Sequence, residues 1–193
     1  MTHRIRIAAA AVSALAAASA ALAATPAAAP APTNPAAPAA ATKPAAAAPA
    51  VSDKVLLERL ERRYTAAFNA KDVKTVMSLY APGDGLFVFD VTPPRQHVGW
   101  ADYKKDWEDL FAAFPGPLKV EMSDLSLTTS GDVAYGHNIQ ASEFTKADGT
   151  KVPTTVRVTD VFRKIKGKWL IVQEHVSVPV DLATMKPDLT SAP

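Results

Sequence analysis

The segment from Val156 to Val180, VRVTDVFRKIKGKWLIVQEHVSVPV, constrains the fold more than any other part of this chain. Apolar residues alternate with polar ones on both sides of Lys166-Gly167, which predicts two antiparallel strands joined by a tight turn. Asp160 and Glu174 fall among the apolar positions. Because a buried carboxylate is costly unless it is paired or protonated, the pattern indicates either a different register or a functional site.

The length of the turn decides which face each carboxylate occupies, because a shift of one residue reverses every side chain. A two-residue turn at Lys166-Gly167 places Asp160 on the same face as Gln173. A three-residue turn with Gly167 left-handed groups Asp160 with Glu174 and separates the apolar from the polar residues. We therefore predict the three-residue turn, with both carboxylates facing inward. The residues that this register leaves on the outer face include Trp169, Ile171 and His175.

The first predicted helix covers residues 53–69. Apolar residues recur along it at spacings of three and four, and Ser52 or Asp53 can cap its first turn. We assign Glu58 and Glu61 to its solvent face, together with the neighbouring arginines. One helical face is therefore expected to pack against the rest of the domain.

The other predicted elements alternate with strong turn and stop signals such as ProGlyAspGly at 82–85 and ProGlyPro at 115–117. They are a short helix after Asp72, a buried strand at 86–90, a third helix beginning near Trp100, and long strands at 118–128 and 133–144. Three helices followed by an antiparallel meander predict a single domain of the α+β class.

The N-terminal part of the chain has a different composition. Arg4 and Arg6 precede an apolar run that ends in Ala21-Leu22-Ala23, which predicts a signal peptide at 1–23 and export to the periplasm or the medium. Residues 24–52 are mostly Ala and Pro, so we expect a disordered linker. The folded domain is then expected at 53–182, with a C-terminal tail at 183–193.

Composition also narrows the function classes. The 21 basic residues nearly balance the 19 acidic ones, and no basic stripe alternates with aromatic residues, so we expect no nucleic-acid partner. The chain has no cysteine, which excludes disulfides and a lipoprotein anchor. The apolar N-terminal run is short and rich in alanine, so no stable membrane insertion is expected after cleavage.

Several short stretches resemble one family. They are RVTD at 157–160, GKWLIV at 167–172, EHVSVP at 174–179, FVFD at 87–90 and GW at 99–100. The chain from Asp53 to Leu182 is similar to SnoaL-like, ketosteroid-isomerase-like proteins of the nuclear transport factor 2-like superfamily. The resemblance implies a cone, in which a curved sheet wraps three helices around an internal pocket. It does not fix the activity, because this fold carries isomerases, cyclases, dehydratases and non-catalytic oligomerisation domains.

Three carboxylates are candidate catalytic residues. Asp160 and Glu174 could serve as proton shuttles in a pocket that raises their pKa, or they could lie hydrated at the mouth of the cone. Asp90 ends the first strand, where it could face the cavity entrance or hold its own turn through backbone hydrogen bonds.

The candidate ligand-binding residues are aromatic or amide side chains. A helical stripe of aromatic residues on the third helix could line a pocket or belong to the core. Tyr64 on the first helix has the same two roles open to it. The candidates are Tyr64, Trp100, Tyr103, Trp107, Phe111, Asn138 and Gln140.

The histidines do not form a recognisable metal motif. Related proteins often have His-x-His where this chain has Gln173-Glu174-His175, and no other His, Asp and Glu cluster has the spacing of metal ligands. We interpret His175 and His137 as structural or outer-face residues. No phosphate-binding loop or nucleophile motif occurs either, so no metal and no cofactor are predicted.

These observations favour an exported domain that binds a small, largely apolar metabolite in a cone-shaped pocket. A cofactor-free isomerase, cyclase or hydratase that uses a pocket carboxylate is the enzymatic alternative. A non-catalytic dimerisation module is the third. In each case we expect a homodimer through the outer sheet face, where Trp169 and Ile171 would otherwise remain in water.

Overall fold

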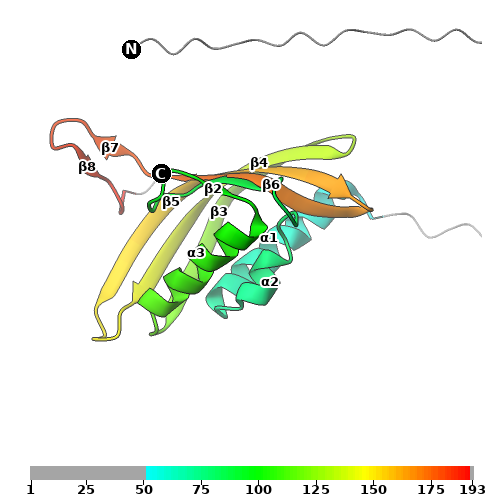
Figure 1. Ribbon diagram of the computed structural model, residues 1–193. Helices are drawn as coiled ribbons and strands as arrows, with labels where there is room; N and C mark the ends of the chain where they lie inside the picture. The colour runs from blue at the N-terminus through cyan, green and yellow to red at the C-terminus, as the bar shows by residue number, and fades with distance from the viewer. Residues whose placement is uncertain (1–50, 192–193) are drawn as a thin grey trace, which may run out of the picture. The chain divides into compact units, whose positions relative to one another are not determined.

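The computed structural model describes residues 51–191 of the chain. The predicted signal peptide and most of the linker therefore lie outside the described residues. Three helices pack against one face of a strongly curved sheet, α1 (Asp53–Asn69), α2 (Val73–Met77) and α3 (Trp100–Ala113) (Figure 1). This arrangement confirms the predicted α+β fold. None of these helices is both long enough and apolar enough to cross a membrane.

The helix starts are set by the residues that the sequence suggests. The Ser52 side chain accepts a hydrogen bond from the Val55 N–H at the start of α1. Asp72 accepts one from the Thr75 N–H at the start of α2, at 3.0 Å. Such caps satisfy backbone donors that have no partner within the helix.

The sheet has six strands in the order β2-β1-β6-β5-β4-β3. Their bounds are β1 (Phe87–Phe89), β2 (His97–Val98), β3 (Leu118–Ser130), β4 (Val133–Thr145), β5 (Lys151–Ile165) and β6 (Lys168–Ser177). β1 runs parallel to β6, and the other pairs are antiparallel. Every second residue of β4 and β5 faces the helices, which closes the concave side of the sheet over a buried core.

The chain after β6 continues beyond the boundary expected from the sequence. Residues that we predicted as a tail form β8 (Lys186–Pro187), which pairs with β7 (Val180–Asp181). The carbonyl of Leu189 then accepts a hydrogen bond from the Thr155 N–H at 2.6 Å. The segment up to Leu189 is thus attached to the edge of β5.

The closing hairpin differs from the prediction at its turn. Lys166 and Gly167 have φ of 50° and 78°, and Ile165 pairs with Lys168, so the turn has two residues and the predicted three-residue turn is wrong. The two left-handed residues match the twist of the strands that they connect. Gly167 adopts this conformation without the steric cost that a side chain would add.

A bulge at Val172 shifts the register of β6 by one residue. Asp160 and Glu174 are therefore paired, as predicted, although the turn has two residues. Val161 pairs with Gln173, whereas Phe162 pairs with Ile171, so Val172 is an extra residue in β6. Beyond the bulge, Asp160 is paired with Glu174, and both face inward as predicted.

Between the turn and the bulge the faces are opposite to those predicted. Trp169 and Ile171 are 6% and 1% exposed and belong to the core, so their predicted place on the outer face is wrong. Ile171 also exchanges backbone hydrogen bonds with Leu79 and Ala81. His175, beyond the bulge, is exposed on the outer face as predicted.

Candidate functional site

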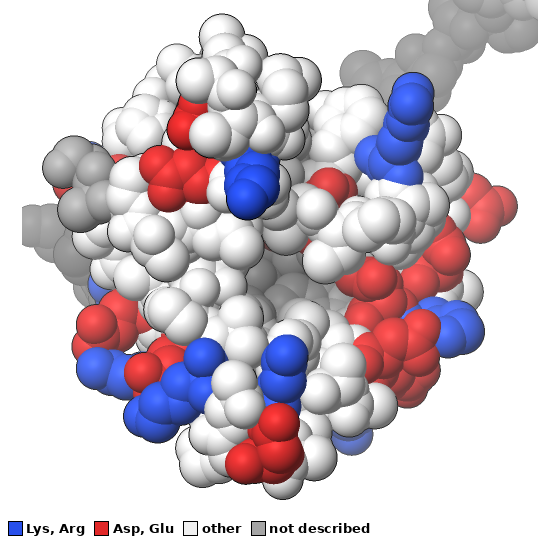
Figure 2. Space-filling model, turned by 90° about the vertical axis from the view of Figure 1, so that its left-hand side faces the viewer, with Lys and Arg blue, Asp and Glu red and all other residues white. Residues whose placement is uncertain are grey.

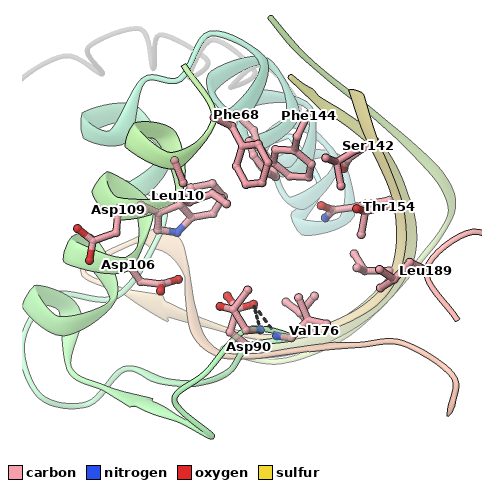
Figure 3. Close-up of a pocket in the computed structure, with 18 of the residues that line it drawn as sticks. Phe68, Asp90, Asp106, Asp109, Leu110, Ser142, Phe144, Thr154, Val176 and Leu189 are labelled. Atoms are coloured by element: carbon pink, nitrogen blue, oxygen red, sulfur yellow. Dashed lines mark hydrogen bonds between the residues drawn. The ribbon is translucent and has the colours of Figure 1, made fainter. Parts of the chain in front are cut away.

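A cavity of about 570 Å³ is lined by the C-terminal part of α3, the end of β4 and the beginning of β5. Figure 2 looks into this hollow, and acidic side chains gather along one side of its opening. Its walls are mainly aromatic and aliphatic, with residues from α1, α3 and the concave face of the sheet (Figure 3). Apolar walls with a few polar groups are typical of sites for small molecules.

The structure places four of the seven candidate ligand-binding residues in the lining of this cavity, Tyr64, Tyr103, Trp107 and Gln140. The rings of Tyr64 and Trp107 meet edge to face at 6.0 Å. Phe68, which we did not single out, packs against both rings and also lines the cavity, with its ring centroid 4.7 Å from that of Trp107. The sequence signal that could have identified Phe68 is its position on the apolar face of α1, next to Tyr64.

The other three candidates lie elsewhere. Trp100 packs against the core, and its indole N–H donates to the carbonyl of Met77 at 2.8 Å. Phe111 packs on Trp107, with ring centroids 5.4 Å apart. Asn138 is fully buried, and neither atom of its amide has a partner among the described residues. None of the three contributes to the lining.

Glu174 lies beneath the cavity floor and is held by two tyrosines. Tyr103 donates to its Oε1 at 2.6 Å, and Tyr80 donates to its Oε2 at 2.8 Å. Burial raises the pKa of Glu174 to about 7, although these two hydrogen bonds favour the charged form and act in the opposite direction. At neutral pH this carboxyl group is therefore divided between its two protonation states.

Asp160 lies next to Glu174 on the neighbouring strand and is 2% exposed. Burial raises its pKa well above the ordinary value, and the charges of Glu174 and Glu61 raise it further. The Oδ1 atom of Asp160 has no hydrogen-bond partner within residues 51–191. Neither group lines the cavity directly.

Glu61 completes this buried acidic group, and our placement of it on the solvent face is wrong. It is 2% exposed, and its Oε1 has no partner among the described residues. Burial raises its pKa to about 8, and the charge of Glu174 adds to the effect. The signal was present in the sequence, since Glu61 stands four residues after Leu57 and three before Tyr64 on the apolar face.

Asp90 connects this group to the cavity. Its Oδ1 accepts the Val91 N–H at 2.5 Å, and its Oδ2 lies 3.3 Å from the hydroxyl of Tyr103, whose closer acceptor is Glu174. Asp90 also lines the cavity, so it combines the turn role and the cavity role that the sequence left open. Tyr103 therefore lies between a carboxylate in the cavity wall and the buried Glu174.

A second polar group that the sequence did not reveal begins at His97, which is 4% exposed. Its Nδ1 lies 3.1 Å from Asp102 Oδ2, and its Nε2 lies 3.6 Å from Asp106 Oδ1. Asp106 lines the cavity, and its pKa is raised by burial and by the charge of Asp90, whereas His97 lowers it. The spacing from His97 to the helix that follows gives no familiar motif.

The remaining histidine assignments concern the outer face. His137 on β4 and His175 on β6 are both exposed, and His175 packs against the ring of Phe89 with centroids 5.5 Å apart. Within residues 51–191, no three His, Cys, Asp or Glu side chains are grouped so that they could hold a metal ion.

Comparison with known proteins is consistent with this geometry. The family model of the SnoaL-like domain matches residues 57–181. No curated protein matches the chain. A crystal structure of an NTF2-like protein of unknown function from Pseudomonas putida KT2440 is 25% identical, with a TM-score of 0.66, and the match covers 75% of this chain and all of that one.

Two further solved structures show the same fold at lower identity. A proposed dehydratase of the NTF2-like family from Streptomyces avermitilis is 17% identical with a TM-score of 0.59, over 67% of this chain and 97% of that one. A ketosteroid isomerase-like protein from Erwinia carotovora atroseptica SCRI1043 is 22% identical with a TM-score of 0.55, over 64% and 93%.

Proposed function

Since the chain belongs to the SnoaL-like domain family, we propose that its cavity binds a small, largely apolar metabolite. The cavity itself carries this proposal, because about 570 Å³ of space remains between α3 and the concave face of the sheet. Aromatic and aliphatic side chains supply most of the wall, so burial of an apolar ligand against them is energetically favourable. A module with a vestigial pocket would instead fill this space with its own side chains.

A pair of variants on one strand tests the binding proposal. Ser142 lines the cavity, whereas its neighbour Ala141 is exposed on the other face of β4. Ser142→Phe should fill part of the cavity, and Ala141→Phe adds the same ring outside it. The probe is N-phenyl-1-naphthylamine, a dye that is uncharged at neutral pH and fluoresces in apolar surroundings.

The wild type and Ala141→Phe should bind the dye, and Ser142→Phe should bind it at least about tenfold more weakly, a loss near 1.4 kcal/mol. Circular dichroism checks that both variants are folded. Equal binding by the two variants, or no binding by the wild type, would contradict the proposal.

A second candidate function is cofactor-free proton transfer, as in an isomerase, cyclase or hydratase. The observation that favours it is the hydroxyl of Tyr103, which contacts Asp90 in the cavity wall and Glu174 beneath it. Asp90 is placed to take a proton from a bound ligand, and Glu174 has a pKa that suits proton exchange near neutral pH. Asp160 acts on Glu174 rather than on the ligand.

The metabolite that copurifies with the protein, extracted and returned to it in D₂O, tests this second function. Mass spectrometry should show deuterium in the metabolite with the wild type and little with Asp90→Asn. The neutral dye should still bind to Asp90→Asn, which separates lost chemistry from lost binding. Undiminished exchange in this variant would exclude Asp90 as the base.

We also propose a homodimer through the outer face of the sheet, although Trp169 and Ile171 no longer support it. Val133 and Tyr135 are 43% and 56% exposed at the start of β4 and supply apolar surface on that face. Light scattering should give a dimer for the wild type and a smaller species for Tyr135→Lys. A wild-type monomer at micromolar concentration would rule out the dimer.

Export is proposed from the sequence of the N-terminal segment. The basic residues, the apolar run and Ala21-Leu22-Ala23 support cleavage by a signal peptidase. Sequencing of the mature protein should then begin at Ala24. A chain that retains Met1 in the cytoplasm would contradict this.

A further inference from the structure

The charged side chains that line the cavity are all acidic. They are Asp90, Asp106 and Asp109, and no Lys, Arg or His is found among the lining residues within the described part of the chain. Glu61 and Glu174 lie outside the lining, and burial raises their pKa to about 8 and about 7, so at neutral pH the negative charge of the cavity comes mainly from the three aspartates. A largely apolar cavity thus has a strongly one-sided electrostatic character.

Two lysines near the cavity are engaged by other groups. Lys105 pairs with Asp109, which points away from the cavity in Figure 3. Lys71 donates to the backbone carbonyls of Phe114 and Gly116 at the rim. These contacts leave Asp90 and Asp106 as the carboxylates that a ligand would meet.

Asp90, which follows β1, and Asp106 on α3 face the same space, and Asp106 points toward Asp90 (Figure 3). The charge of Asp90 raises the pKa of Asp106, which shows that the two carboxylates repel each other. His97 offsets the charge of Asp106 when it is protonated, but it is also held by Asp102. No ion pair to Asp90 is found within residues 51–191.

The wall also offers polar groups that form no side-chain hydrogen bond within residues 51–191. Gln140 is 3% exposed and lines the cavity, and its amide makes none of the side-chain hydrogen bonds found within residues 51–191. The indole N–H of Trp107, in the same wall, has no partner in this part of the chain either. The buried indole N–H without a partner is destabilising unless a ligand or water meets it, and it is independent of the carboxylates.

We propose that the metabolite bound in this cavity is an amine, with its protonated nitrogen between Asp90 and Asp106 and its apolar body against the aromatic wall. This inference rests on the proposed binding function and specifies its ligand class. Charge-assisted hydrogen bonds to the carboxylates hold the ammonium group. The faces of Tyr103 and Trp107 can add cation–π attraction. Gln140 is placed to hydrogen-bond a polar group elsewhere on the ligand.

An anionic ligand of the same size should bind more weakly than an amine. A carboxylate or phosphate group in the cavity would meet Asp90 and Asp106 with no lining cation to compensate it, and the low dielectric of the wall strengthens the repulsion. The structure therefore predicts discrimination by charge among molecules of the same size and shape.

Three probes with one carbon skeleton test this inference, 4-phenylbutylamine, 4-phenylbutan-1-ol and 4-phenylbutanoate. Their affinities are measured by calorimetry at pH 7. The variants are Asp90→Asn, Asp106→Asn and the control Asp124→Asn. Asp124 lies on β3 outside the cavity, and asparagine tolerates its positive φ of 53°.

For the wild type we expect the amine to bind at least about tenfold more tightly than the alcohol, and the carboxylate to bind most weakly. Asp90→Asn should remove most of the preference for the amine over the alcohol, and Asp106→Asn should reduce the preference in the same way. The amide at position 90 can still accept the Val91 N–H, so the turn should persist. Asp124→Asn should retain the full preference.

The outcomes separate this inference from the binding proposal. If N-phenyl-1-naphthylamine binds but the alcohol binds as tightly as the amine, or the carboxylate binds best, the amine inference is wrong and the cavity proposal stands. If neither the dye nor any of the three probes binds, both fail. A preference for the amine that survives in Asp90→Asn and Asp106→Asn would also overturn the inference.

Discussion

Replacement of Glu61 by glutamine should make the protein more stable at alkaline pH. The raised pKa means that the folded state keeps a proton that the unfolded state releases once the pH exceeds the ordinary value of 4.5. The stability from this group is complete below pH 4.5 and is lost as the pH rises to about 8. Glu61→Gln has nearly the same shape but cannot ionise, so it avoids this loss.

The size of the effect follows from the shift. Each pKa unit corresponds to about 1.4 kcal/mol, so a change from 4.5 to about 8 gives a loss on the order of 5 kcal/mol between acid and alkaline pH. This is a large share of the 5–15 kcal/mol that is usual for the unfolding of a domain. Wild type and variant should therefore be similar near pH 5 and differ by several kcal/mol near pH 9.

Urea unfolding at a series of pH values, followed by tryptophan fluorescence, measures these free energies. Glu58→Gln is the matched control, because Glu58 is on the same helix but is not fully buried. The control should follow the wild-type pH dependence. A wild-type stability that rises between pH 5 and pH 8, or a Glu61→Gln protein with an unchanged slope, would refute the reasoning about buried carboxyl groups.

Two further changes probe the surroundings of this group. Tyr103→Phe removes a hydrogen bond that favours the charged form of Glu174, so the pKa of Glu174 should rise. Carboxyl ¹³C NMR measures this pKa. An unchanged value would show that the hydroxyl does not stabilise the carboxylate. Gly136→Ala should destabilise the domain by about 1–3 kcal/mol in urea unfolding. The new Cβ would lie 2.7 Å from Leu127 Cδ2 and 3.0 Å from the carbonyl oxygen of Ser126. A variant as stable as the wild type would show that β3 can move to make room for the methyl group.

Much of the fold could be predicted from the sequence because local signals and tertiary packing agree. The apolar spacing on α1, the Asp72 cap and the Pro- and Gly-rich stops all correspond to observed boundaries. The inward orientation of Asp160 was also predictable from the alternating pattern. These features depend on short stretches of chain, in which each residue constrains its immediate neighbours.

The parts that could not be predicted depend on contacts distant in sequence. Glu61 was assigned to solvent because it is a charged residue, although it lies on the apolar face of α1. In the folded domain it is buried together with Glu174. His97 is joined to the cavity only because β2 and α3 bring it to Asp106. Leu189 reaches the lining because the segment after β6 turns back along β5. No local pattern carries this information for His97 and Leu189, whereas the position of Glu61 on the apolar face of α1 was a local signal.

The extra residue at Val172 explains how one strand can serve both the core and the site. Near the turn, β6 buries Trp169 and Ile171 against the core. Strict alternation from Ile171 would point Gln173 inward and Glu174 outward, because side chains on a strand alternate between the two faces. The bulge reverses the alternation, so Glu174 reaches the interior beside Asp160. The β-bulge, with a carboxylate inward beyond it, therefore brings Glu174 to Asp160 in this buried acidic group.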